Sequence, residues 1–243
     1  MRSISPPTLF LDFDGVICNS LEECYRSSWM VVSGDSEPPD AAAYRALFAA
    51  CRPFIRSGED YVVAHEWAQR QEVPSSQDEF DRSLAAKGPE DLADLKVRLY
   101  RVRDALLAHR RSEWLSWNPL YKGMAQALEG QRENEAVWIL STKKASFIGE
   151  ILAYHGISWP EKRTVYTGNR RKLDLIAEIL PEGTATLIDD QIDHLDFSHP
   201  TCRCLLALWG YASPAAMKTA PATVSLDDAL TLISSFPRPR RDE

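Results

Sequence analysis

The most informative segment of this 243-residue chain is Thr8-Leu9-Phe10-Leu11-Asp12-Phe13-Asp14-Gly15-Val16, close to its start. Its short apolar run, ended by Gly15, predicts a buried strand over residues 8–13. Two carboxylates, Asp12 and Asp14, stand at the end of that strand. Because the crevice of an open parallel sheet lies beyond the carboxyl ends of its strands, both become candidates for chemistry.

Four more strand-like segments follow in the second half of the chain, and helical patterns separate them. They are Ala136–Leu140, Thr164–Thr167, Ala185–Ile188 and Cys204–Trp209. Strands that alternate with helices are joined by right-handed crossovers, which build a parallel sheet with helices on both faces. The sequence therefore predicts an α/β fold with a doubly wound, Rossmann-like core.

The residues between the first strand and this second half read as helix throughout. The clearest pattern follows Pro89, where Leu92, Leu95, Leu99 and further apolar residues recur at steps of three and four. Such a stripe predicts one long amphipathic helix with the proline in its first turn. We therefore expect an all-α domain over residues 19–117, inserted into an α/β core made of residues 1–18 and 118–243.

Composition limits the classes of protein that this chain can belong to. It has 28 Lys and Arg against 35 Asp and Glu, a net charge of −7, which argues against a nucleic-acid binder. We see no apolar run of the roughly 18 residues that a membrane span requires. Five scattered cysteines are typical of a reducing compartment. We expect a cytoplasmic protein without a nucleic-acid or membrane partner, as a monomer or a homodimer.

Polar residues follow the other predicted strands at the points where they end. Ser141 and Thr142 follow one strand, Lys172 opens the helix after the next, and Asp189 and Asp190 end the third. Adjacent carboxylates at a buried strand end repel each other unless a cation compensates them. Ligands that are all oxygens favour Mg²⁺ over zinc. We therefore expect a Mg²⁺ site at this edge of the sheet.

These residues resemble, in chain order, the four motifs of the haloacid dehalogenase (HAD) superfamily. The motifs are Asp12-Phe13-Asp14-Gly15-Val16, Ser141, Lys172 and Asp189-Asp190. Leu208-Trp209-Gly210-Tyr211 is similar to a segment of phosphoglycolate-phosphatase-like members, and the helical insertion resembles their cap domain in position. The resemblance implies a hydrolase that removes phosphate from a small phosphorylated metabolite.

The resemblance also implies a role for each residue. Asp12 would be the nucleophile that forms an aspartyl-phosphate, and Asp14 would act as the general acid and base. Ser141 and Lys172 would bind the phosphoryl group, with Thr142 beside them. The metal would lie between Asp12, the Asp14 carbonyl and a carboxylate of the last motif. We favour Asp190 as that ligand, with Asp189 behind it; Asp189 paired with Asp193 is the alternative.

Substrate specificity is the least determined part of the prediction. Arg52 and Arg56 lie four residues apart, one helical turn, and are candidates to bind an anionic group of the substrate; a solvated pair of arginines is the alternative. Rival functions are a sugar-phosphate mutase, a phosphonate hydrolase or a non-enzymatic protein that binds a phosphometabolite. Retention of every catalytic residue type argues against the last.

Overall fold

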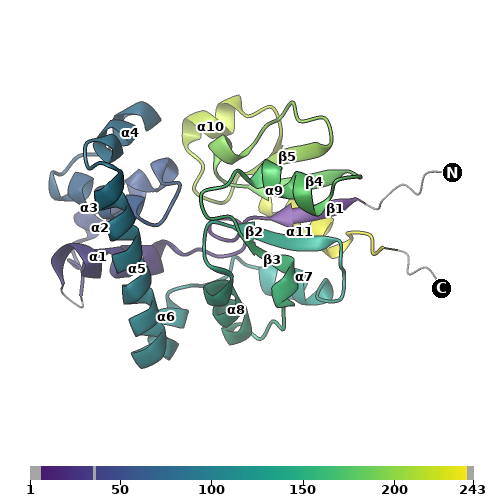
Figure 1. Ribbon diagram of the computed structural model, residues 1–243, viewed down its shortest axis with the longest axis horizontal. Coiled ribbons are helices and arrows are strands. Elements are labelled where there is room, and N and C mark those ends of the chain that lie inside the picture. The colour runs from purple at the N-terminus through teal and green to yellow at the C-terminus, as the bar shows by residue number, and fades with distance from the viewer. Residues whose placement is uncertain (1–6, 35–36, 240–243) are drawn as a thin grey trace. The chain divides into compact units, whose positions relative to one another are not determined.

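The chain divides into an α/β unit and a helical unit. The computed structural model describes residues 7–34 and 37–239 (Figure 1). One unit comprises residues 1–19 and 120–243, and the other residues 20–119. The sequence predicts these boundaries between residues 18 and 19 and between residues 117 and 118. The two connecting segments lie next to each other in the α/β unit, where Cys18 and Leu120 form an antiparallel bridge.

A six-stranded sheet in which every neighbouring pair is parallel forms the centre of the α/β unit. Its order is β3-β2-β1-β4-β5-β6, and Leu9 of β1 lies between Val137 of β2 and Thr186 of β4. The direction of strand addition reverses at β1, which makes β1 and β4 the topological switch point. The strands are β1 (Thr8–Leu11), β2 (Val137–Ser141), β3 (Thr164–Tyr166), β4 (Ala185–Asp189), β5 (Cys202–Ala207) and β6 (Thr223–Val224).

Helices cover both faces of this sheet, which confirms the predicted fold class. Helix α9 packs through Leu173 and Ile176 against Phe10 and Leu187 of the sheet. Figure 1 shows α10 on one side of the strands and α7 and α8 on the other. The helices are α7 (Met124–Gly130), α8 (Ala145–Tyr154), α9 (Lys172–Ile179), α10 (Pro214–Thr219) and α11 (Leu226–Ser234).

The last part of the sheet differs from the prediction. The predicted strand 204–209 is β5 at 202–207, and the two-residue β6 was not predicted. Leu208 and Trp209 extend the apolar run in the sequence, but Leu208 is exposed, and Trp209 Nε1 donates a hydrogen bond to Val16 O at 3.0 Å. The last two residues of the apolar run therefore lie outside β5, and Trp209 contacts the loop after β1.

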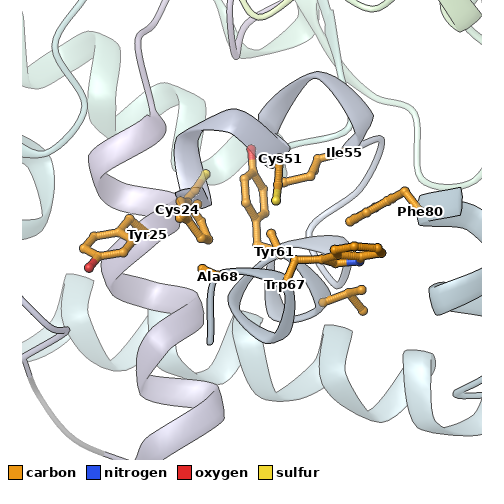
Figure 2. Packing of buried hydrophobic residues seen from close by; sticks show 11 residues of the cluster. Cys24, Tyr25, Cys51, Ile55, Tyr61, Trp67, Ala68 and Phe80 are labelled. Carbon is orange, nitrogen blue, oxygen red and sulfur yellow. The ribbon is translucent and has the colours of Figure 1, made fainter. Parts of the chain in front are cut away.

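The helical unit contains six α-helices among its described residues. Helix α5 begins at Pro89, as the sequence predicts. Eleven buried residues form one hydrophobic cluster, part of which Figure 2 labels, with Trp67 and Phe80 among them. They come from α1, α2, α3, α4 and Ile55, which follows η1. The elements are α1 (Leu21–Ser33), α2 (Ala42–Cys51), the 3₁₀-helix η1 (Arg52–Phe54), α3 (Asp60–Gln69), α4 (Gln77–Ala85), α5 (Pro89–His109) and α6 (Arg111–Ser116). None of the described helices of the chain combines the length and apolar composition that a membrane crossing requires.

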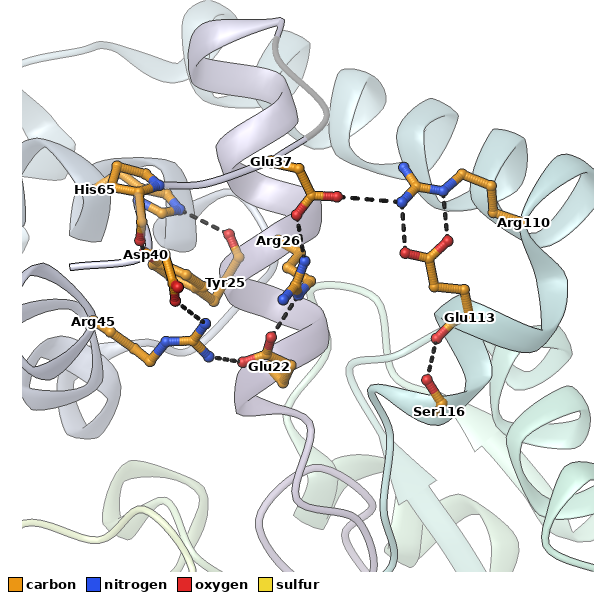
Figure 3. A network of polar contacts seen from close by, with 11 residues as sticks. Glu22, Tyr25, Arg26, Glu37, Asp40, Arg45, His65, Arg110, Glu113 and Ser116 are labelled. Atoms are coloured by element: carbon orange, nitrogen blue, oxygen red, sulfur yellow. Dashed lines mark hydrogen bonds and ion pairs between the residues drawn. The ribbon is translucent and has the colours of Figure 1, made fainter. Parts of the chain in front are cut away.

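Charged side chains on the first turns of α1 tie several segments of the helical unit together (Figure 3). Glu22 accepts hydrogen bonds from Arg26 and Arg45, and Arg26 Nη1 also donates to Glu37 at 2.7 Å. These pairs are partly exposed, so each contributes little on its own. Together they fix the start of α1, where the chain enters the helical unit.

Candidate active site

The turn after β1 carries Asp12 and Asp14. The Asp12 N–H donates to Ile188 O at 2.9 Å, so Asp12 lies beside the end of β4. The chain then turns at Gly15, whose φ of 90° lies in the left-handed region. A β-carbon at Gly15 would lie 2.1 Å from Asp190 Oδ2. Both the backbone conformation and the available space therefore require glycine in the Asp-x-Asp-Gly sequence.

Lys172 forms ion pairs with two carboxylates, one directly after β1 and one at the end of β4. It is the first residue of α9, and its side chain is 2% exposed. Its Nζ lies 2.7 Å from Asp12 Oδ1 and 2.7 Å from Asp189 Oδ2. An ammonium group has three N–H donors, so the third can bind a further oxygen at this place.

The two adjacent carboxylates at the end of β4, Asp189 and the following Asp190, have different surroundings. Asp189 is fully buried, and its Oδ2 contacts Lys172 Nζ and His194 Nδ1, the latter at 3.1 Å. Its Oδ1 accepts the Gln191 N–H at 2.9 Å and lies 3.2 Å from the same histidine nitrogen. Both oxygens of Asp189 are thus occupied by protein donors. The choice between Asp189 and Asp190 as the direct metal ligand stays a prediction.

Asp190 is positioned by the segment after β5. Its Oδ2 accepts the Tyr211 N–H at 2.8 Å. Gly210 packs so closely that a β-carbon there would lie 2.4 Å from Gly15 O and 2.5 Å from Asp190 Cβ. Tyr211 Oη also donates to Asn19 Oδ1 at 2.8 Å. The segment 209–211 therefore holds both Asp190 and the loop after β1, which explains the glycine at 210.

Burial and charge act in opposite directions on the pKa values of these groups. Burial raises the pKa of Asp12, and Asp189 and Asp14 raise it further, against the opposing effect of Lys172. Burial alone would also raise the pKa of Asp189, but Lys172 and then His194 hold it well below its usual range. Burial would lower the pKa of Lys172, yet the carboxylates of Asp12 and Asp189 raise it. Lys172 therefore stays charged, and Asp12 is the carboxylate that most needs a cation.

Carboxylates outnumber ammonium groups in this cluster. The four carboxylates are those of Asp12, Asp14, Asp189 and Asp190, and the two ammonium groups are those of Lys143 and Lys172. One oxygen each from Asp12, Asp189 and Asp190 lies within 4.8 Å of the other two, and the described residues contain no second group of this kind. Two uncompensated negative charges and an all-oxygen donor set fit a hard divalent cation.

The end of β2 brings a hydroxyl and a second lysine to the same edge. Ser141 is 1% exposed, and its Oγ accepts the Lys143 N–H at 3.3 Å, which leaves the hydroxyl proton to be donated elsewhere. Thr142 is half-buried. The Lys143 side chain is 2% exposed, and its Nζ lies 3.1 Å from Asp14 Oδ1.

The predicted arginine pair has a different geometry from the one expected. Pro53 lies in the 3₁₀-helix η1, which ends at Phe54, so Arg52 and Arg56 are not separated by one α-helical turn. The Arg52 guanidinium lies 5.5 Å from the centroid of the Tyr61 ring, and Arg56 Nη1 donates to Asp81 Oδ1 at 2.7 Å. Both contacts lie within the helical unit, and substrate binding by these arginines stays a prediction.

Solved structures of known proteins are similar to this chain over almost its whole length. A predicted phosphoglycolate phosphatase from Haemophilus somnus 129PT is 16% identical, with a TM-score of 0.53 over 96% of this chain and 99% of the other. A HAD family hydrolase from Deinococcus radiodurans R1, which holds phosphate and sodium, is 15% identical, with a TM-score of 0.53 over 98% and 100%. This chain has the HAD-like fold.

The HAD-like fold occurs with more than one named activity. Protein tyrosine kinase A of Mycobacterium tuberculosis is 14% identical to this chain, with a TM-score of 0.54 over 95% of this chain and 99% of the other. No protein-family model and no curated protein matches the sequence. At such identities the likeness establishes the arrangement of the chain, and the reaction has to be inferred from the site.

Sequence reasoning missed two residues that contact the site carboxylates directly. Lys143 is adjacent to a second lysine, Lys144, and the sequence does not distinguish the two, although a Ser-Thr-Lys sequence at a strand end places Lys143 as near the crevice as the serine. His194 follows Asp189 by five residues, in the 3₁₀-helix η3 (Ile192–His194), and no spacing rule indicates that contact. Asp193, the alternative partner of Asp189, is exposed and lies outside the carboxylate group.

Proposed function

We propose that this protein is a Mg²⁺-dependent phosphatase that hydrolyses a small phosphate monoester through a phosphorylated Asp12. The observation that carries the proposal is the excess of carboxylates over ammonium groups at the switch point of the sheet. A phosphate dianion cannot approach such a site unless a cation screens it. The buried ammonium group of Lys172, beside the same carboxylates, would supply the fixed part of that positive charge.

Residues of this chain would hold the metal and orient the phosphoryl group. Asp12, Asp190 and the backbone carbonyl of Asp14 are the proposed ligands, and Asp189 supports them through Lys172. When bound, Mg²⁺ would neutralise charge on the transferring phosphoryl group. The Ser141 hydroxyl and the free N–H of Lys172 would donate to its non-bridging oxygens.

In the first half of the reaction, an Asp12 oxygen would attack phosphorus while the bond from phosphorus to the ester oxygen breaks. Asp14 would give its proton to the leaving oxygen, which departs as an alcohol. In the second half, Asp14 would take a proton from water as the water oxygen attacks phosphorus. The bond between Asp12 and phosphorus then breaks, which releases inorganic phosphate and restores the carboxylate.

We also propose that the helical unit is a mobile cap that contributes to substrate selection. The proposal rests on the adjacent connecting segments, because two linkers that cross at one place permit a hinge. The substrate class is a small phosphorylated metabolite, and the protein is proposed to act in the cytoplasm as a monomer or homodimer.

The test is hydrolysis of p-nitrophenyl phosphate and a panel of phosphorylated metabolites by purified protein. We expect turnover with Mg²⁺, none after chelation, and recovery when Mg²⁺ is added back. Asp12→Asn keeps the shape of the side chain but removes the attacking charge, so kcat should fall by on the order of 10⁴–10⁶-fold. Asp196→Asn, at a carboxylate that lies outside the cluster and accepts hydrogen bonds from Ser198, serves as the matched control.

Four results would contradict the proposal. Full turnover by chelated protein would exclude the metal-assisted mechanism, and near-normal turnover by Asp12→Asn would exclude the covalent one. An active protein that moves phosphate within one molecule without releasing it would be a mutase. Binding of a phosphometabolite with no turnover of any ester would make the protein a sensor.

A further inference from the structure

Lys143 is a buried ammonium group that the proposed phosphatase chemistry does not use. Its side chain is 2% exposed, so the ammonium is almost entirely removed from water. Burial of an unpaired charge is expensive, and buried lysines are therefore paired. Lys143 meets this requirement at Asp14, where Nζ lies 3.1 Å from Oδ1. The two lysines of the site thus have different partners, because Lys172 contacts Asp12 and Asp189.

The two oxygens of Asp14 are not equivalent. Oδ1 is shielded from solvent and faces Lys143, whereas the side chain as a whole keeps 15% of its surface exposed. Asp14 follows β1 and Lys143 follows β2, so each is anchored to a strand of the same rigid sheet. The ion pair therefore restricts the rotation of the Asp14 carboxyl group by holding Oδ1 against Lys143.

We infer that Lys143 is the positioning residue for acid–base catalysis by Asp14, an inference that rests on the proposed phosphatase function. The ammonium occupies Oδ1, so the proton that Asp14 transfers is carried on Oδ2. That proton goes to the ester oxygen as the bond to phosphorus breaks. In the second half, Oδ2 takes a proton from the attacking water. Lys143 itself contacts neither the phosphoryl group nor the leaving oxygen.

This role makes a prediction about leaving groups. An alkoxide is a poor leaving group and needs a proton from Asp14, whereas 2,4-dinitrophenolate leaves readily without one. Lys143→Met keeps the length of the side chain but removes the charge that orients Asp14. We expect kcat for an alkyl phosphate, such as glycerol phosphate, to fall roughly 10–100-fold, part of the 10²–10⁴-fold that a general acid contributes. For 2,4-dinitrophenyl phosphate the loss should be under about threefold, because no proton transfer assists that step.

Further variants separate positioning from folding and from phosphate binding. Lys143→Arg keeps the ion pair and should recover most of the alkyl phosphate activity. Lys144→Met changes the neighbouring lysine, which lies over the Phe147 ring, and is the matched control. In protein that already carries Asp14→Asn, Lys143→Met should have almost no additional effect on the alkyl substrate. Activity of Lys143→Met toward the dinitrophenyl ester also shows that the variant is folded.

These experiments test the role of Lys143 separately from the proposed function. Selective loss on the alkyl substrate, absent once Asp14 is replaced, supports it. Equal loss on both esters, or a rise in KM on both, would make Lys143 a phosphate-binding residue and overturn it, as would the absence of any loss. If the unaltered protein hydrolyses neither ester, it is the proposed function that fails.

Discussion

Two clusters of buried charge, one in each unit of the chain, are built on opposite plans. In the helical unit, Glu23 of α1 is completely buried and accepts two hydrogen bonds from Arg103 of α5, at 2.7 and 2.8 Å. The Glu23 carboxylate also accepts hydrogen bonds from Ser27 Oγ at 2.7 Å, Trp114 Nε1 at 3.2 Å and Cys24 Sγ at 3.6 Å. One carboxylate therefore faces one guanidinium and several neutral donors.

The cluster at the end of the sheet is unbalanced in comparison. Two lysines face four carboxylates there, and burial raises the pKa of the proposed nucleophile Asp12. A balanced pair is complete without a ligand, so it holds α1 and α5 together. In an unbalanced group the carboxylates repel one another until a cation or a substrate supplies the missing favourable interactions. In this protein both clusters are buried, so it is charge balance that distinguishes the structural cluster around Glu23 from the candidate active site.

The largest effect on stability is expected from breaking the balanced pair. Arg103→Met leaves the Glu23 carboxylate buried without its counter-charge, which should cost about 3–5 kcal/mol of unfolding free energy. The measurement is chemical denaturation, with hydrogen exchange of α1 and α5 to localise the loss. The double variant Glu23→Leu with Arg103→Met removes both charges and should recover much of that loss. No loss in the single variant would show that this pair is dispensable, contrary to the comparison.

A second prediction concerns two ionisable groups of α3 whose effects oppose each other. Burial raises the pKa of Asp60 to about 6, despite the Arg56 and Ser57 amides, and burial lowers the pKa of His65 to about 4. As the pH falls from 6 to 4, the folded state takes up the Asp60 proton before the unfolded state does, which adds stability. His65 takes up its proton later than in the unfolded state, which removes stability. The two slopes nearly cancel in this window.

Asp60→Asn should expose the slope of His65. Above pH 6 this variant should be more stable than the unaltered protein by up to about 3 kcal/mol, from roughly two pKa units at 1.36 kcal/mol each. Its stability should then fall as the pH drops from 6.5 toward 4, because only the unfolded histidine is protonated there. Urea unfolding at several pH values, with hydrogen exchange of α3, measures both. A pH profile unchanged by the substitution would contradict the opposing pair.

The smallest expected effect is the stabilisation of the unbalanced cluster by metal. Mg²⁺ at one hundred times its dissociation constant should stabilise the unaltered protein by about 2.7 kcal/mol. Asp190→Asn should lose most of that increment, and its metal-free form should be more stable than the unaltered metal-free protein, because one repelling carboxylate is gone. Thermal unfolding with and without Mg²⁺ measures both quantities.

Asp193→Asn and Glu23→Gln serve as controls for that experiment. Neither should change the increment from Mg²⁺, since Asp193 is exposed and Glu23 is already balanced. An increment that Asp193→Asn removes and Asp190→Asn keeps would favour the alternative ligand pair of Asp189 and Asp193.

Local patterns predicted those parts of the fold in which each element follows from its own residues. The run from Thr8 and the stripe after Pro89 predicted a strand and a long helix, and both are observed. The patterns gave a wrong strand boundary where an apolar residue contacts a distant segment of the chain and does not belong to the strand that its neighbours form. Trp209 lies in a run typical of a strand, but its indole binds the carbonyl of Val16. The two-residue β6 is too short for any periodicity to show.

The α/β class, the helical segment after the first strand and the candidate residues at the strand ends could all be predicted from the sequence, because the period of apolar residues and the places where it stops are local properties. Only the tertiary structure decided the strand order, the partner of each lysine and the difference between Asp189 and Asp190. Adjacent residues of a strand point to opposite faces. Lys172 and His194 reach one of these carboxylates, and the Tyr211 amide reaches the other. These contacts join residues 5 to 21 positions apart, and no local pattern records which of them the folded chain brings together.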